Sequence, residues 1–175
     1  MKLTVLRLGH RKKRDPRLTT HVALTARALG ADEVIISGEK DEGILNSIKD
    51  VSSRWGGNFK VEYRKQWKKI VTEFKEKGAL IVHLTMYGLP YQQVISEIKK
   101  TDKDLLLVVG SEKVPGEIYK LADYNVSVTS QPHSEASALA LFLHDFFEGK
   151  ELNKKFENAE IKIVPHKKTK EVIKS

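Results

Sequence analysis

Short apolar runs alternate with helical patterns along most of this chain, and this alternation limits the possible folds more than any other feature. Between the runs, apolar residues recur at helical spacing, as Ile44, Ile48 and Val51 do. Strands that alternate with helices predict an α/β fold with a mostly parallel sheet flanked by helices. Strands are expected at residues 4–8, 33–37, 59–63, 80–84, 105–109 and 125–128, and helices at 20–29, 43–55, 67–74, 91–98, 115–121 and 134–147.

The end of the chain departs from this pattern. Two short runs, residues 160–164 and 171–173, flank Pro165-His166-Lys167-Lys168, which predicts a lysine-rich β-hairpin. We therefore expect one domain over residues 1–150 and a basic tail over residues 151–175. The lysines of the tail either extend a basic surface, help to form a dimer or only solubilise the terminus.

Polar loops follow several of the predicted strands. In a parallel sheet, ligands bind beyond the carboxyl ends of the strands, so these loops are candidates for a binding site. Three of them are rich in Gly, Pro or Ser, and the remaining one is strongly basic. The loops cover residues 9–17, 85–90, 110–115 and 129–135.

Each feature of these loops also has a purely structural interpretation. Gly110 can simply end a strand, and Ser134 or Ser130 can cap the last helix. His83, in an apolar strand, is typical of a core histidine with its hydrogen bonds satisfied. Arg27 is harder to explain, because a guanidinium on an apolar helix face must find partners or point into a cleft.

Several familiar chemistries find no support in the sequence. There is no P-loop, no G-x-G-x-x-G after a strand, no H-E-x-x-H spacing and no G-x-S-x-G elbow. The chain has no cysteine, which excludes disulfides and thiolate metal ligands. No run is long enough to span a membrane and no signal peptide is present. These observations predict a cytoplasmic protein without metal.

The net charge of +8 favours a polyanionic partner, most simply a nucleic acid, although lysines can also serve only solubility. The charge is concentrated after the first predicted strand. Phosphate contacts from such a cluster position an RNA without reading its sequence. The candidate RNA-binding residues are Arg7, Arg11, Lys12, Lys13, Arg14 and Arg17, with His21 on the helix that follows.

Four long segments carry a family resemblance. They are LRLGHRKKRDPRLTTHVALTARALGAD, VHLTMYGLP, VVGSEKVP and ADYNVSVTSQPHSEASALALFLHDFFEGK, and they span most of the chain in order. Together they closely resemble the archaeal tRNA cytidine-56 2′-O-ribose methyltransferases of the SPOUT (α/β-knot) superfamily. The resemblance implies a deep trefoil knot near the C-terminus, S-adenosylmethionine bound by the knot loops, a homodimer, and methylation of a T-loop cytidine in tRNA.

Carried onto this chain, the resemblance places the cofactor in the loops at residues 84–88, 110–114 and 128–135. Turning backbone at Gly88, Gly110 and Pro132 can offer N–H and C=O groups to the adenine edge. Apolar side chains can line its faces, and Glu112 and Glu135 are candidates for the ribose hydroxyls or the methionine amine. The expected cofactor-binding residues are Leu84, Thr85, Tyr87, Gly88, Gly110, Ser111, Glu112, Lys113, Val114, Val128, Thr129, Ser130, Gln131, Pro132, His133, Ser134 and Glu135.

The resemblance also implies a catalytic arginine on the first helix, and Arg27 is the residue that matches. The family's usual Asn, six residues earlier, is His21 here. Because an arginine is nearly always protonated, we expect Arg27 to hold the 3′-phosphate and polarise the 2′-hydroxyl. Either Arg27 or a phosphate oxygen accepts the proton. The basic loop is expected to lie beside Arg27, at the mouth of the cofactor site.

Three alternatives remain. A non-catalytic RNA-binding module would keep the basic loop but not bind S-adenosylmethionine. A SPOUT enzyme acting on a base nitrogen or on ribosomal RNA would also bind the cofactor, but Arg27 favours a ribose target because base-methylating relatives generally lack this arginine. A flavodoxin-like nucleotide-binding domain would account for the strand-end loops but not for the basic first loop.

Overall fold

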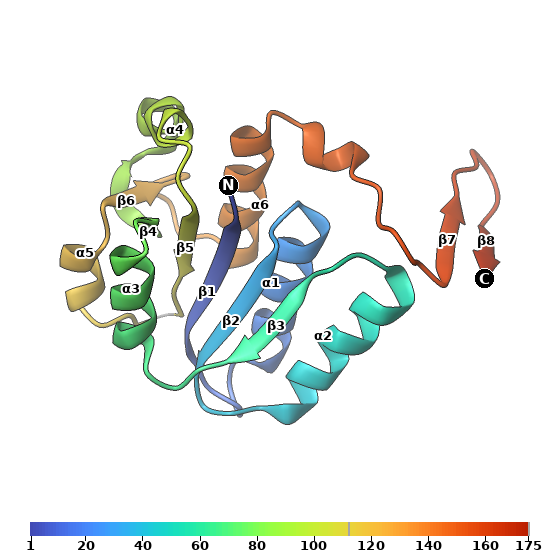
Figure 1. The fold of residues 1–175 in the computed structure, drawn as a ribbon, viewed down its shortest axis with the longest axis horizontal. Helices are drawn as coiled ribbons and strands as arrows, with labels where there is room; N and C mark the ends of the chain where they lie inside the picture. Colours follow the sequence, from blue (N-terminus) through green and yellow to red (C-terminus); the bar gives the residue numbers. More distant parts are fainter. Residues whose placement is uncertain (112, 175) are drawn as a thin grey trace.

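The centre of the molecule is a six-stranded sheet whose strands are all parallel, in the order β3-β2-β1-β5-β4-β6. In the computed structural model, which describes residues 1–111 and 113–174, helices cover both faces of this sheet (Figure 1). The α/β fold predicted from the alternating pattern is therefore confirmed. The strands are β1 (Leu3–His10), β2 (Glu33–Gly38), β3 (Lys60–Tyr63), β4 (Leu80–Pro90), β5 (Leu105–Val109) and β6 (Tyr124–Ser127).

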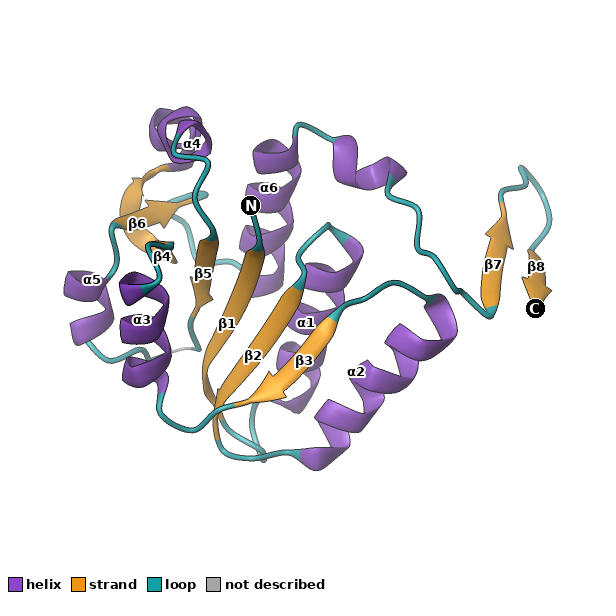
Figure 2. Cartoon of the chain, viewed as in Figure 1, coloured by secondary structure: helices purple, strands orange, loops and turns teal. Residues whose placement is uncertain are grey.

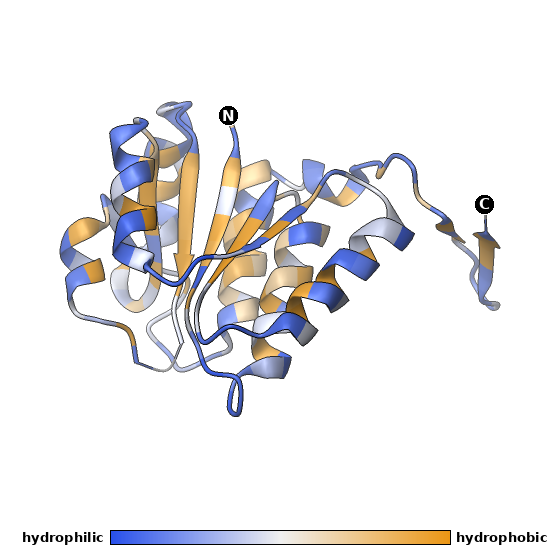
Figure 3. Ribbon diagram, turned by 60° about the horizontal axis from the view of Figure 1, so that its bottom comes forward, coloured by the Kyte–Doolittle hydropathy of each residue, from blue (hydrophilic) through white to orange (hydrophobic). Residues whose placement is uncertain are grey.

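Alternation along the strands divides the core into two layers. On β1, Leu3 and Val5 face one layer, whereas Leu6 and Leu8 face the other. Figure 3 shows the apolar residues concentrated on the strands and on the inner faces of the helices. The first layer is covered by α1 (Pro16–Ala28), α2 (Glu42–Trp55), α4 (Tyr91–Lys100) and α6 (Glu135–Phe147), and the second by α3 (Trp67–Glu76) and α5 (Glu117–Leu121).

Two elements differ from their predicted bounds by more than two residues. Helix α1 begins at Pro16 instead of residue 20, because a proline in the first turn has no N–H that would need a helical partner. Strand β4 continues to Pro90, although it was expected to end at Leu84. Leu84 and Leu89 both lie opposite Val126 of β6, so residues 85–88 loop out between two paired stretches of one strand.

The predicted hairpin is present and consists of β7 (Ile161–Val164) and β8 (Glu171–Lys174), which project from the rest of the molecule (Figure 2). The segment before it is attached to the body. The 3-10 helix η1 (Lys150–Asn153) packs on α6, and the Gly57 N–H donates to the Glu157 carbonyl over 2.8 Å. We therefore propose that the tail begins near residue 160. The knot concerns how the chain is threaded, and it stays a prediction from the resemblance.

Candidate functional site

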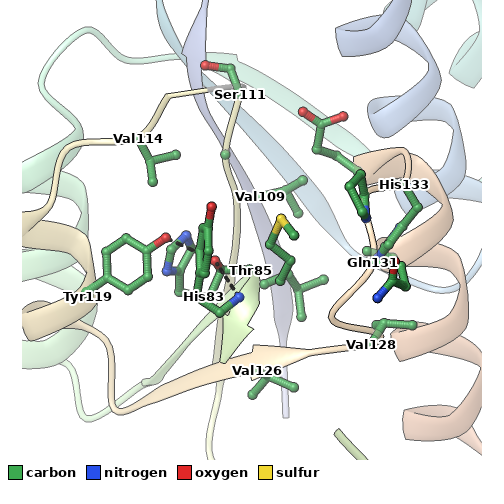
Figure 4. A pocket seen from close by; sticks show the side chains of 17 residues that line it. His83, Thr85, Val109, Ser111, Val114, Tyr119, Val126, Val128, Gln131 and His133 are labelled. Atoms are coloured by element: carbon green, nitrogen blue, oxygen red, sulfur yellow. Dashed lines mark hydrogen bonds between the residues drawn. The ribbon is translucent and has the colours of Figure 1, made fainter. Parts of the chain in front are cut away.

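A cavity of about 260 Å³ lies beyond the carboxyl ends of β4, β5 and β6, where the loops after these strands meet (Figure 4). This is the sheet edge at which parallel strands present ligand sites. All three predicted cofactor loops contribute to its wall. The predicted residues that line it are Leu84, Thr85, Tyr87, Gly110, Ser111, Val114, Val128, Gln131, Pro132, His133 and Glu135.

Two glycines explain why the wall is so closely built. A Cβ atom on Gly110 would lie 2.1 Å from Cγ1 of Val114, and one on Gly88 would lie 2.4 Å from the Val126 backbone nitrogen. Both contacts are far shorter than van der Waals distances. Only glycine at these positions allows the loops after β4 and β5 to approach their neighbours this closely.

Several residues expected in the cofactor loops do not line the cavity. Gly88 packs against the backbone of β6, and the Ser134 hydroxyl accepts a hydrogen bond from Ala136 N over 3.2 Å as the N-cap of α6. Ser134 therefore acts as a helix cap, which is the purely structural interpretation considered for it. The hydroxyl of Thr129 accepts from the Gln131 N–H in a local turn. Lys113, Thr129 and Ser130 are also absent from the lining, and Glu112 lies outside the described residues.

The cavity also contains side chains that the sequence did not point to. His83 is buried, as a core histidine would be, yet it lines the cavity and its ring lies edge-on to Tyr119 at 4.9 Å. Tyr119 in turn shares a 3.0 Å hydrogen bond with the Thr85 hydroxyl (Figure 4). A histidine within an apolar strand was the available signal. The other additions are Met86, Val109, Val126 and Ala138.

Hydrogen bonds settle the tautomer of His83. Asn125 Nδ2 donates to the Tyr119 carbonyl over 2.8 Å, so Asn125 Oδ1 is the acceptor for His83 Nδ1–H at 2.9 Å. Burial lowers the pKa of His83, and the bond to Asn125 only partly offsets this. The ring is therefore neutral near pH 7, with its hydrogen on Nδ1.

The strand that leads into the basic loop approaches this cavity. Ser111, in the wall, has its Oγ 3.0 Å from where a Cβ of Gly9, near the end of β1, would stand. Arg11 is partly buried, and its Nε donates to Asp15 over 2.9 Å, a bond that lowers the pKa of Asp15. The neighbouring predicted RNA-binding residues are exposed: Lys12, Lys13, Arg14, Arg17 and His21.

Comparison with known proteins identifies the family. A family model described as tRNA ribose 2′-O-methyltransferase, aTrm56, matches residues 55–173. The chain belongs to this family. A tRNA (cytidine(56)-2′-O)-methyltransferase from Methanocaldococcus jannaschii is 57% identical over 176 residues, covering 99% of this chain and 97% of the relative. One from Thermococcus kodakarensis is 56% identical over 174 residues, covering 98% and 96%.

Solved structures agree on the fold. The TrmH/SpoU tRNA modifying enzyme of A. aeolicus superimposes with a TM-score of 0.65 at 19% identity, covering 89% of this chain and 80% of that one. The SpoU methyltransferase AviRb from Streptomyces viridochromogenes, solved in complex with AdoMet, gives 0.63 at 16% identity, covering 85% of this chain and 57% of that one. At these identities the likeness establishes a shared SpoU-type fold.

Arg7 does not fit the RNA-binding role that the sequence suggested for it. Its side chain is 0% exposed, so an RNA phosphate outside the protein cannot reach it. The guanidinium instead donates to the Gly110 carbonyl through Nη1 and to the Thr19 hydroxyl through Nε. Arg7 lies inside the sheet because it occupies β1 itself, before the loop begins. The prediction for Arg7 was therefore wrong.

Arg27 is likewise not where this family resemblance led us to expect it. Helix α1 has 13 residues and so spans about 20 Å, which carries its last turn to the opposite edge of the sheet. There Arg27 is 8% exposed, its Nη2 donates to the Gly56 carbonyl over 2.6 Å, and its guanidinium lies 4.8 Å from the Phe156 ring centre. Within the chain, the expected position of Arg27 beside the basic loop and the cavity was wrong.

The residues that the structure describes hold no group of three or more His, Asp or Glu side chains arranged to bind a metal ion. Among the same residues, no helix is long and apolar enough to cross a membrane.

Proposed function

We propose that the protein transfers a methyl group from S-adenosylmethionine to the 2′-hydroxyl of cytidine 56 in tRNA. The observation that carries this proposal is the close approach of Gly9 to Ser111, which sets the end of β1, and so the start of the basic loop, beside the cavity wall. A bound RNA backbone and a bound cofactor would then meet at one edge of the sheet. Membership in the tRNA ribose 2′-O-methyltransferase family and the two archaeal relatives support the same reaction.

The residues of the cavity fit S-adenosylmethionine. Leu84, Val114 and Val128 offer apolar walls of the kind that hold a planar adenine. The glycine at position 110 lets the backbone itself line the cavity, where a larger residue would collide with Val114. Glu135, at the start of α6, is the acidic group for a ribose hydroxyl or the methionine amine. When bound, the cofactor supplies an electrophilic methyl group on a sulfonium.

The exposed cations of the basic loop are suited to the RNA backbone. Lys12, Lys13, Arg14 and Arg17 are charged and exposed on the segment that follows β1, and β1 ends at the same sheet edge as the cavity. Such side chains bind phosphate oxygens and orient an RNA, and bases in a single-stranded loop can be turned out for chemistry. In this proposal the loop holds the T-loop phosphates while the target ribose faces the cofactor.

We also propose that the protein works as a homodimer, as the resemblance implies. Helix α6 buries Leu139, Phe142 and Leu143 against the body, whereas Leu141 on its outer side is 50% exposed. Leu141 is therefore the position on α6 at which an interface can be tested without disturbing the core. Light scattering should give twice the mass of one chain, and Leu141→Lys should shift the protein toward the monomer. A wild-type protein of single-chain mass would contradict the dimer.

The decisive experiment uses labelled S-adenosylmethionine and two unmodified tRNA transcripts that differ only by cytidine or uridine at position 56. Modified positions are mapped by resistance to alkaline cleavage, which requires a free 2′-hydroxyl. We expect the cytidine transcript to take up label and to show one resistant linkage, directly after cytidine 56. The uridine transcript should show neither. Label without a resistant linkage would mean base methylation, and no label despite cofactor binding would exclude this tRNA site. Either outcome overturns the proposal.

A further inference from the structure

Beneath the basic loop, a connection of hydrogen bonds between buried side chains runs from His10 through Thr19 to Arg7 and the Gly110 carbonyl at the cavity wall. Asp41, at the start of α2, lies beyond the far end of this connection, with its Oδ2 3.7 Å from His10 Nε2 and so outside hydrogen-bond distance. His10, Thr19 and Arg7 are each at most 1% exposed. The layer between β1 and α1 in which they lie is otherwise apolar, with Val5, Val22 and Ala23 among its buried residues.

The donor and acceptor of each bond follow from the chemistry of the groups. Arg7 Nε can only donate, so the Thr19 hydroxyl oxygen, 3.3 Å away, accepts. The hydroxyl hydrogen is then left for His10 Nδ1 at 2.8 Å, which accepts it. A neutral His10 consequently carries its own hydrogen on Nε2, the atom that lies 3.7 Å from Asp41 Oδ2. Burial lowers the pKa of His10, in keeping with this neutral form.

Arg7 converts this arrangement into a fixed orientation at the cavity. A guanidinium is planar, so a bond at Nε restricts the direction in which Nη1 can donate. Nη1 donates to the carbonyl of Gly110, the first residue of the loop that carries Ser111 and Val114 in the cavity wall. Gly110 has no side chain to hold its peptide in place, so the bond from Arg7 is a direct restraint on the plane of this peptide.

We propose that Arg7, held by Thr19 and His10, is a positioning residue that fixes the Gly110 peptide for binding of the cofactor. This inference rests on the proposed function, because it takes S-adenosylmethionine as the ligand of the cavity. For stability alone, an apolar side chain would serve as well at this position, since burying a cation in an apolar strand is costly. A buried arginine at this position is explained if its guanidinium is required to bind the Gly110 carbonyl.

Thr19 offers a cleaner test than Arg7. Removal of a wholly buried arginine from β1 threatens folding, whereas Thr19→Val keeps the shape of the side chain and removes only the hydroxyl. Without it, Arg7 loses the acceptor that orients its guanidinium. We expect the Kd for S-adenosylmethionine to rise at least fivefold, while the Kd for tRNA stays within twofold of wild type because the exposed cations are untouched. Thr19→Ser restores the hydroxyl and should restore cofactor affinity.

The neighbouring threonine provides a matched control. Thr20 lies on the same turn of α1, and its hydroxyl donates to the Pro16 carbonyl over 2.8 Å without touching the connection. Calorimetric titration with S-adenosylmethionine would compare wild type, Thr19→Val, Thr19→Ser and Thr20→Val, after each has been shown to unfold cooperatively. Thr20→Val should bind like wild type.

The outcomes separate this inference from the proposed function. A folded Thr19→Val variant that binds the cofactor like wild type would overturn the positioning role alone. Equal weakening by Thr19→Val and Thr20→Val would also overturn it, because a general effect on α1 would then explain both. A wild-type protein that binds no S-adenosylmethionine would overturn the proposed function and this inference with it.

Discussion

At the scale of single residues, Arg27 is expected to stabilise the fold and not to act in the reaction. Its hydrogen bond to the Gly56 carbonyl holds the last turn of α1 to the end of α2, and its contact with the Phe156 ring holds it to the segment before the hairpin. Arg27→Ala should therefore lower the free energy of unfolding by about 2 kcal/mol, the size of a buried charge-assisted hydrogen bond. The Kd for S-adenosylmethionine should stay unchanged. Urea unfolding and calorimetric titration would measure the two quantities.

Arg54→Ala is the matched control for this prediction. Arg54 is an exposed arginine whose Nη2 pairs with Asp50 on the surface of α2, and such pairs contribute little to stability. Its removal should leave the free energy of unfolding almost unchanged. If Arg27→Ala abolished methyl transfer without any loss of stability, the catalytic role implied by the resemblance would hold after all.

His83 should make the stability of the protein depend on pH. Its pKa is lowered by burial in the folded state, so below pH of about 6.5 the unfolded chain binds a proton that the folded chain does not. The free energy of unfolding should then fall as the pH decreases from about 6.5 toward the lowered pKa. His83→Gln should reduce this slope in urea unfolding between pH 7.5 and 5.5. His133→Gln, which replaces an exposed histidine, is the control, and equal slopes in all three proteins would contradict the prediction.

The residues of the cavity were predictable where chain order decided them. Gly110 and Val128 immediately follow β5 and β6, and Leu84 lies on β4 between these two strands, so their meeting follows from a parallel sheet. Tyr119 and Ala138 reach the cavity from the helices α5 and α6, and no local pattern marks such an approach. Arg27 was misplaced because the resemblance assigned it a role beside the cavity, whereas the end of the predicted helix 20–29 on which it lies is at the opposite edge of the sheet.

At the scale of elements, the close approach of β4 and β6 is the most sensitive feature of the site. A Cβ on Gly88 would lie 2.4 Å from the Val126 nitrogen and 2.5 Å from the Asn125 carbonyl carbon. Gly88→Ala should push the two strands apart and lower the free energy of unfolding by about 1–3 kcal/mol, the usual cost of overpacking. Because both strands contribute to the cavity wall, the substitution should also weaken S-adenosylmethionine binding at least tenfold. Thermal unfolding and calorimetric titration would test both effects.

Gly116→Ala is the matched control for the Gly88→Ala prediction. Gly116 has a right-handed helical conformation, with φ of −59°, and a Cβ there would meet no described atom within 4 Å. The added methyl group should leave both stability and cofactor affinity near those of wild type. Equal tolerance of the two substitutions would show that β4 and β6 can separate without affecting the cavity.

The helices and strands themselves were largely predictable. Each buries one face or side, and this burial leaves a periodic pattern of apolar residues in the sequence. The sheet strands and the hairpin all form near their expected positions. The extent of β4 was not predictable, because its second paired stretch, at Leu89 and Pro90, depends on a contact with β6 from far along the chain. Long-range pairing of this kind leaves no trace in the local pattern of residues 85–90.

At the scale of the whole molecule, the order of the strands in the sheet was beyond the sequence pattern. Alternation of strands and helices predicts a parallel sheet but is compatible with several strand orders. The observed order brings β1, with its basic loop, next to β5, with the Gly110 loop. That adjacency unites a cationic surface and a cavity which the sequence could only place separately.

This adjacency predicts how tRNA binding responds to salt. Each phosphate contact releases counterions, so the logarithm of the binding constant should fall steeply with the logarithm of salt concentration. Replacing Lys12, Lys13 and Arg17 by Gln should reduce that slope by about 2 to 3. The same charge change at the opposite sheet edge, in the exposed Lys60, Lys100 and Lys103, should leave the slope near the wild-type value. Fluorescence binding titrations at several salt concentrations would compare the three proteins. Equal slopes for the two triple variants would mean that the net charge of +8 attracts tRNA without a defined docking surface.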